Sequence, residues 1–131
     1  MTVWVVDDDR SFRYVMRKML ERTGLVDTIV ECTDGTDFLH QFSETDAPSA
    51  PSIIMLDLMM PRMDGWEVLE ALSDWYRTGR AQPSVFVISS SIDRRDAERA
   101  RTFPFVVRFT EKPVSVDKLA DLLRAVPTPY I

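Results

Sequence analysis

Five short apolar runs without regular polar alternation recur along the chain, separated by segments long enough to form a helix. They span residues 2–6, 28–32, 53–56, 85–88 and 105–109. Runs of this length that lack polar alternation are typical of strands buried on both faces. The sequence therefore predicts parallel strands with helices packed on both sides of the sheet.

The segments between the runs carry apolar residues at helical spacing. In the first segment, apolar residues recur three or four positions apart from residue 12 to residue 20. Asp9 or Ser11 is expected to cap this helix, and Gly24 to end it. Its solvent-facing side is expected to carry Arg10, Arg13 and Arg17. Similar spacing predicts helices within 38–42, 66–76 and 119–126, and a less apolar one within 93–101.

Five strand–helix pairs predict an α/β fold with a doubly wound, five-stranded parallel sheet. An eight-fold barrel would need more such pairs. A chain of 131 residues with 45% hydrophobic content can bury one core. We expect a single domain over residues 1–131 with no output domain, because few residues follow the last helix.

Composition narrows the classes of function. The formal net charge of -5 disfavours direct nucleic-acid binding. The one cysteine, Cys32, cannot form an internal disulfide, which fits a reducing compartment. The first residues lack the pattern of a signal peptide, and no apolar run is long enough to insert into a membrane. We expect a cytoplasmic protein.

Charged and polar residues follow the predicted strands at one edge of the sheet. Asp7 and Asp8 end the first strand, Asp57 the third, Ser89 the fourth, and Lys112 follows the fifth. Open parallel sheets bind ligands beyond these carboxyl ends. Neighbouring carboxylates repel unless a cation is present, and oxygen ligands favour Mg²⁺, with Mn²⁺ as the alternative ion. A carboxylate can also accept a phosphoryl group, a reaction that needs positioning and positive charge.

Four stretches carry a resemblance to a known family. They are Val5-Val6-Asp7-Asp8-Asp9, the run from Leu56-Asp57 through Met60-Pro61-Arg62-Met63-Asp64-Gly65, Ser89, and Lys112-Pro113. Together they resemble the receiver domain of two-component response regulators, and in particular its single-domain, chemotaxis-regulator-like members. The resemblance implies a flavodoxin-like (βα)5 fold with strand order 2-1-3-4-5. That order is an established property of the family, not a deduction from this sequence.

The resemblance also implies a role for each residue at the sheet edge. Asp57 would be the phospho-acceptor and Asp8 a direct metal ligand, with Asp7 binding the ion through water or positioning it. Met59 would offer its backbone carbonyl to the metal. Lys112 would pair with the phosphoryl group, and the Lys112-Pro113 bond would be cis.

Two further positions would transmit the structural change that follows phosphorylation. Ser89 occupies the family's switch hydroxyl position, and Phe109 the switch aromatic position, where many members have tyrosine. Residues 101–105 depart from the small-residue segment common before the fifth strand, so an atypical output face is expected.

The function implied is that of a stand-alone phospho-accepting signalling domain, not an enzyme acting on other substrates. Its partners would be a sensor histidine kinase or histidine-phosphotransfer protein and a downstream protein target, reached through altered contacts or a phosphorelay. One alternative is a pseudo-receiver acting as a constitutive interaction module. Another is a phosphatase-type hydrolase, but these place a second acid two residues after the nucleophile, where this chain has Met59.

Overall fold

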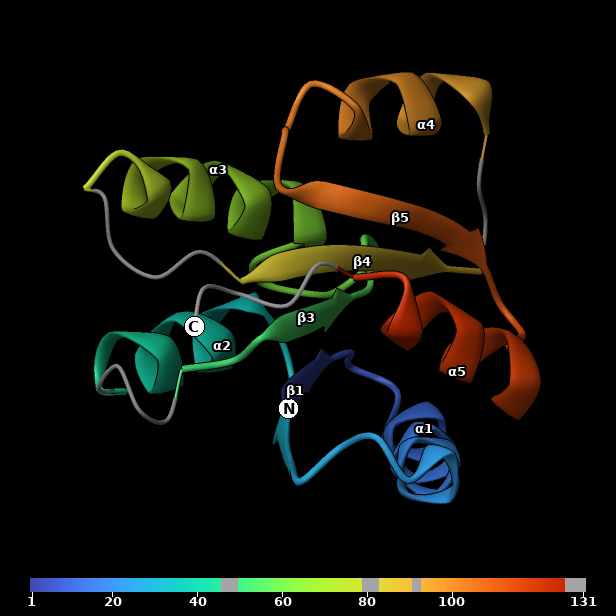
Figure 1. Cartoon of the computed structure of the whole chain (residues 1–131). Helices are drawn as coiled ribbons and strands as arrows, with labels where there is room; N and C mark the ends of the chain where they lie inside the picture. The colour runs from blue at the N-terminus through green and yellow to red at the C-terminus, as the bar shows by residue number, and fades with distance from the viewer. Residues whose placement is uncertain (46–49, 79–82, 91–92, 127–131) are drawn as a thin grey trace.

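The computed structural model describes residues 1–45, 50–78, 83–90 and 93–126, which form five strands and five helices in alternation (Figure 1). The strands are β1 (Thr2–Val6), β2 (Thr28–Cys32), β3 (Ile53–Leu56), β4 (Ser84–Ser89) and β5 (Val106–Glu111). The helices are α1 (Arg10–Thr23), α2 (Gly35–Ser43), α3 (Gly65–Tyr76), α4 (Arg94–Ala100) and α5 (Val116–Arg124). The predicted doubly wound α/β fold is confirmed.

All strand pairs are parallel, in the predicted order β2-β1-β3-β4-β5. Helices α1 and α5 lie together on one face of the sheet and α2 and α3 on the other (Figure 1). Each face has its own buried cluster, because alternate residues of one strand point to opposite sides. In β1, Trp4 and Val6 pack toward α2 and α3, whereas Val3 and Val5 pack toward α1 and α5. Within the described ranges, no helix is long and apolar enough to cross a membrane.

The predicted bounds hold for the first three strands and shift for the last two. β4 begins at Ser84 and ends at Ser89, and β5 continues to Glu111. These polar ends pair within the sheet, Ser84 with Ile53 and Ser89 with Glu111. A pattern read from apolar residues alone cannot detect pairing at polar ends.

Short polar side chains start every helix. Asp9, Asp34, Asp64 and Asp93 cap α1 to α4, and Ser115 caps α5. These side chains accept hydrogen bonds from backbone N–H groups that the first helical turn leaves unpaired. Gly24 ends α1 in the left-handed conformation, with φ at 70°, as predicted.

The atypical segment 101–105 forms a turn between α4 and β5 that carries an aromatic cluster. The Phe105 ring stacks on Tyr76 of α3, with ring centroids 4.2 Å apart, and Phe103 packs at 5.7 Å from Phe105. The Tyr76 hydroxyl donates to the Pro83 carbonyl, and burial raises the pKa of this tyrosine above its usual value. The departure from the family pattern therefore packs the turn against the end of α3.

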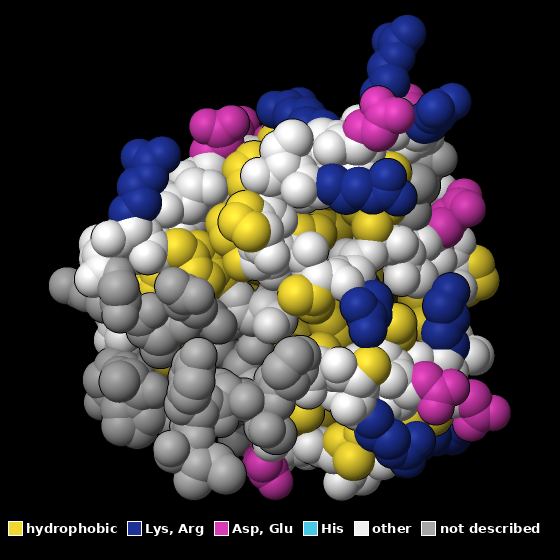
Figure 2. Space-filling model, turned by 45° about the horizontal axis from the view of Figure 1, so that its top comes forward, with side chains coloured by type: hydrophobic (Ala, Val, Ile, Leu, Met, Phe, Trp, Pro, Cys, Tyr) yellow, Lys and Arg dark blue, Asp and Glu magenta, His cyan; other side chains and the backbone are white. Residues whose placement is uncertain are grey.

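Helix α4 lies along β5, on a face where Lys and Arg side chains are interspersed with hydrophobic ones (Figure 2). Arg94 is almost fully exposed and pairs with Glu98 of the same helix. Arg99 instead stacks over the Trp66 ring of α3, with its guanidinium carbon 4.2 Å from the ring centroid. Arg94 thus faces solvent, whereas Arg99 joins two helices.

Gly65 brings the start of α3 against the backbone that carries Asp57. A methyl group at Gly65 would lie 2.5 Å from the Asp57 carbonyl oxygen and 2.7 Å from Leu58 Cα. We expect Gly65→Ala to lower the free energy of unfolding by about 1–3 kcal/mol, since the backbone must shift. Urea unfolding measures it, with Glu70→Ala on the exposed side of α3 as control. Equal stability of the two variants would contradict this close approach.

Candidate functional site

Three acidic side chains meet at the carboxyl ends of β1 and β3. Asp7 is 1% exposed and Asp57 is 6% exposed, whereas Asp8 faces solvent. One carboxylate oxygen from each lies within 4.8 Å of the others. The strands are held side by side here, with the Asp57 backbone N–H donating to the Val6 carbonyl at 3.0 Å. The structure thus brings these predicted site residues together.

Backbone N–H groups orient the two buried carboxylates. The Asp9 N–H donates to Asp7 Oδ1 at 2.8 Å, and the Met59 N–H donates to Asp57 Oδ1 at 3.3 Å. The Met59 side chain itself is 69% exposed, so this position contributes its backbone rather than its side chain. The role of the Met59 carbonyl as a metal ligand stays a prediction.

Burial raises the pKa of both carboxyl groups. The pKa of Asp57 rises to about 6, chiefly because the group is desolvated and secondly because Asp7 lies beside it. Desolvation also raises the pKa of Asp7, against the opposing hydrogen bond from Lys112. Two buried acids that are difficult to ionise together, with exposed Asp8 next to them, form a site suited to a divalent cation.

Lys112 reaches this pair from the end of β5. Its ammonium lies 2.8 Å from Asp7 Oδ2 and 3.8 Å from Asp57 Oδ2, and the side chain is 17% exposed. The Lys112 backbone N–H donates to the Ser89 carbonyl at 2.9 Å, which joins the ends of β4 and β5. The Lys112-Pro113 bond is cis, as the resemblance implies.

Ser89 is fully buried at the end of β4, and its hydroxyl has no hydrogen-bond partner among the described residues. A buried hydroxyl without a partner has a free-energy cost. The same hydroxyl is available to an incoming polar group.

Phe109 lies on β5, next to β4. It pairs with Val87 of β4 and stands in the middle of β5 rather than at its end. The ring is half-buried and packs against the cluster on the α2 and α3 side of the sheet. Its role as the switch aromatic stays a prediction.

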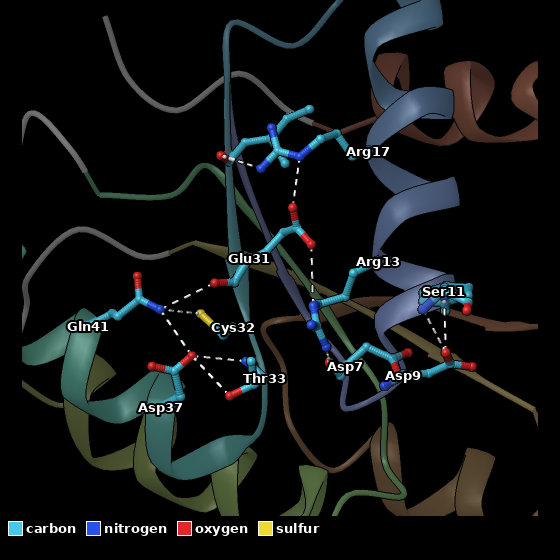
Figure 3. A network of polar contacts seen from close by, with 12 residues as sticks. Asp7, Asp9, Ser11, Arg13, Arg17, Glu31, Cys32, Thr33, Asp37 and Gln41 are labelled. Atoms are coloured by element: carbon cyan, nitrogen blue, oxygen red, sulfur yellow. Dashed lines mark hydrogen bonds and ion pairs between the residues drawn. The ribbon is translucent and has the colours of Figure 1, made fainter.

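Arg13 lies beside the site, where the sequence analysis did not place it. It was expected to face solvent, but it is 9% exposed and donates to the Asp7 carbonyl at 2.7 Å (Figure 3). Its Nε also contacts Glu31 of β2 at 3.3 Å, and Glu31 binds Arg17 at 2.8 Å. Glu31 offered a signal, because an acid inside a strand that was predicted to be buried would require a partner.

A separate ion pair holds the loop that follows Asp57. Arg62, with φ at 65°, donates to the Asp34 carboxylate, which is 3% exposed and caps α2. The Asp37 N–H is the main cause that lowers the pKa of Asp34, and the Arg62 guanidinium adds to it. The ion pair joins the loop from β3 to α3 to the start of α2.

The sequence and the fold match those of a known protein class. Residues 3–124 match the response regulator receiver domain family, and the chain belongs to that family. A two-component response regulator from Cytophaga hutchinsonii superposes with a TM-score of 0.85 at 27% identity, covering 94% of this chain and 93% of that one.

Two curated relatives show the settings in which such a domain occurs. Protein PilG of Pseudomonas aeruginosa is 26% identical over 95% of this chain and 86% of its own length. A protein-glutamate methylesterase/protein-glutamine glutaminase of Myxococcus xanthus is 32% identical over 87% of this chain. The match spans 30% of the methylesterase.

Proposed function

We propose that Asp57 accepts a phosphoryl group from phosphohistidine on a sensor histidine kinase or a histidine-phosphotransfer protein. The observation that carries this proposal is the buried Asp57 carboxylate, 3.8 Å from the Lys112 ammonium and grouped with Asp7 and Asp8. Receiver domains belong to two-component signalling, which supplies this class of donor. The one further reaction that we propose is hydrolysis of the domain's own aspartyl phosphate, and no other substrate is proposed.

The transfer makes one bond and breaks one. A carboxylate oxygen of Asp57 attacks phosphorus, the phosphorus–nitrogen bond of phosphohistidine breaks, and the imidazole leaves with the electron pair and takes a proton from solvent. The Met59 N–H fixes the orientation of the nucleophile by holding Asp57 Oδ1. Lys112 then pairs with the phosphoryl oxygens.

The donor set fits a hard divalent ion. Asp7, Asp8, Asp57 and the Met59 carbonyl would hold Mg²⁺ or Mn²⁺, since carboxylates and carbonyls are the ligands these ions favour. When bound, the ion supplies positive charge against the phosphoryl oxygens.

The signal would arise from how the site accommodates a dianion. The unpartnered Ser89 hydroxyl turns toward a phosphoryl oxygen, and Phe109 follows into the space that Ser89 leaves. Phosphorylation thereby shifts the balance between two existing states and changes the protein contacts of the domain. A stand-alone, cytoplasmic mode of action stays a prediction.

Labelling with a small phosphodonor tests this function without a partner protein. With acetyl phosphate and Mg²⁺, the phosphorus–oxygen bond to the acyl group breaks, acetate leaves, and intact mass should rise by one acid-labile phosphoryl group. Asp57→Asn should abolish the increase, whereas Asp74→Asn at an exposed acid of α3 should leave it unchanged. Labelling that survives Asp57→Asn would refute the assignment, and its absence from the natural chain would favour the pseudo-receiver.

A further inference from the structure

We propose that Phe12 is a positioning residue for Lys112: its ring face holds the ammonium at the phosphoryl site when a metal ion engages the carboxylates. This inference rests on the proposed function of Asp57. The Lys112 Nζ lies 3.9 Å from the centroid of the Phe12 ring, close enough for a cation–π interaction.

The position of the Phe12 ring is fixed by the structure around it. Phe12 stands in the first turn of α1, where its backbone N–H donates to the capping carboxylate of Asp9 at 3.2 Å. Its half-buried ring packs against the cluster between the sheet and helices α1 and α5. The chain that leads into this turn carries Asp7 and Asp8, so ring and acids belong to one short segment.

A bound metal ion would affect the three contacts of the Lys112 ammonium differently. Asp7 at 2.8 Å and Asp57 at 3.8 Å are candidate ligands, so an ion competes with Lys112 for their oxygens. The Phe12 ring carries no ligand atom, and an ion in the acidic cluster does not compete for its face. Of these three contacts, the ring is therefore the one that persists in the metal-loaded site.

Without the Phe12 ring, the Lys112 side chain is free to move at the phosphoryl-transfer step, where its charge is needed in place. The side chain is already 17% exposed, and a released ammonium can turn toward water. Each transfer would then require the lysine to be ordered again as the phosphoryl group arrives. Phe12 would thus affect the rate of phosphorylation without touching the reacting atoms.

The first test measures labelling rates at saturating Mg²⁺. Phe12→Leu, which keeps an apolar side chain without the ring, should slow acetyl phosphate labelling by about 2- to 30-fold, the range of an ordinary cation–π contact. Phe12→Tyr should restore the rate. The control is Tyr14→Leu, which removes an exposed ring 5.6 Å from Lys18 on the same helix. A Phe12→Leu rate equal to that of the natural chain would overturn the inference.

Pentafluorophenylalanine at position 12 separates positioning from packing. It retains the shape of the ring but reverses the charge of its face. Labelling as slow as in Phe12→Leu is expected, and the natural rate would overturn the inference. This comparison also decides the question if Phe12→Leu fails to fold.

An NMR measurement reads the contact independently of activity. The ring should shift the Lys112 ε-methylene protons upfield, and the shift should persist with Mg²⁺ and beryllofluoride but vanish in Phe12→Leu. Disappearance of the shift on loading the natural chain would overturn the inference. If the natural chain is not labelled at all, the proposed function fails, whereas normal labelling without dependence on Phe12 defeats this inference alone.

Discussion

Replacing Lys112 with methionine is expected to lower the free energy of unfolding by about 3–5 kcal/mol at neutral pH without divalent cations. The ammonium lies 2.8 Å from Asp7 Oδ2 and 3.8 Å from Asp57 Oδ2, and both acids are almost fully buried. Methionine fills similar volume but carries no charge. The two carboxylates would then repel each other in a site with little solvent, which is more costly than losing an exposed ion pair.

Chemical unfolding followed by far-UV circular dichroism measures this loss. Lys118→Met, at an exposed lysine of α5, is the matched control and should change stability by no more than about 0.5 kcal/mol. Added Mg²⁺ should recover much of the loss in Lys112→Met, because a cation would again neutralise the acids. Unchanged stability in Lys112→Met would show that the buried acids do not depend on this ammonium.

Replacing Asp57 with asparagine is expected to have the opposite sign and to raise the free energy of unfolding by about 3 kcal/mol at neutral pH without metal. The pKa of Asp57 is raised from 3.8 to about 6 by desolvation and by Asp7, with a smaller contribution from Asp8, against Lys112 and the Met59 N–H. Asparagine has the same shape and retains an oxygen for that N–H, but it carries no charge to desolvate. The ionised carboxylate of Asp57, the proposed phospho-acceptor, therefore destabilises the folded domain.

The pH dependence follows from the direction of the shift. Between pH 3.8 and about 6, the folded chain binds more protons at Asp57 than the unfolded chain does, so stability falls as pH rises through this window. Below this window the Asp57 carboxyl group does not lower the free energy of unfolding, and above it the full loss of stability is present. The advantage of Asp57→Asn should thus be largest above pH 6 and vanish near pH 3.8.

Thermal and urea unfolding over this pH range, with and without Mg²⁺, provide the measurement. Asp74→Asn, at an exposed acid of α3, is again the control. Mg²⁺ should reduce the advantage of Asp57→Asn at neutral pH, because the ion relieves the same repulsion in the natural chain. A destabilised Asp57→Asn at neutral pH would mean that Lys112 more than compensates for burial of the carboxylate.

The sequence predicted the structure best at positions where a buried apolar run ends and a polar residue follows. The strands β1 to β3 were predicted with correct bounds because β-branched or apolar residues begin and end them. Asp57 and Asp7 were placed at the site because an acid directly after a buried strand is costly to ionise unless a cation or a donor meets it. Ser84 and Ser89 were excluded from β4 because hydrogen bonding between strands leaves no trace in hydrophobicity.

Contacts between helices and strands could not be predicted from the sequence, for a different reason. The spacing in α1 places Arg13 away from the apolar stripe, but it does not reveal that Glu31 of β2 lies beside that helix face. The same holds for Phe12, which was assigned to the core and also faces the Lys112 ammonium. Such pairs depend on how helix and sheet are packed, and a single sequence does not encode that packing as a local pattern.

The stacking of Arg99 on Trp66 has an optical consequence. Trp4 lies 2% exposed in the core and packs edge-on against Phe38 and Phe42, so its emission should report the integrity of the fold. Trp66 instead stands between α3 and α4, with the Arg99 guanidinium carbon 4.2 Å from its ring centroid, so its surroundings depend on how the two helices pack. A fluorescence change at Trp66 that follows phosphorylation would therefore report the α3–α4 contact.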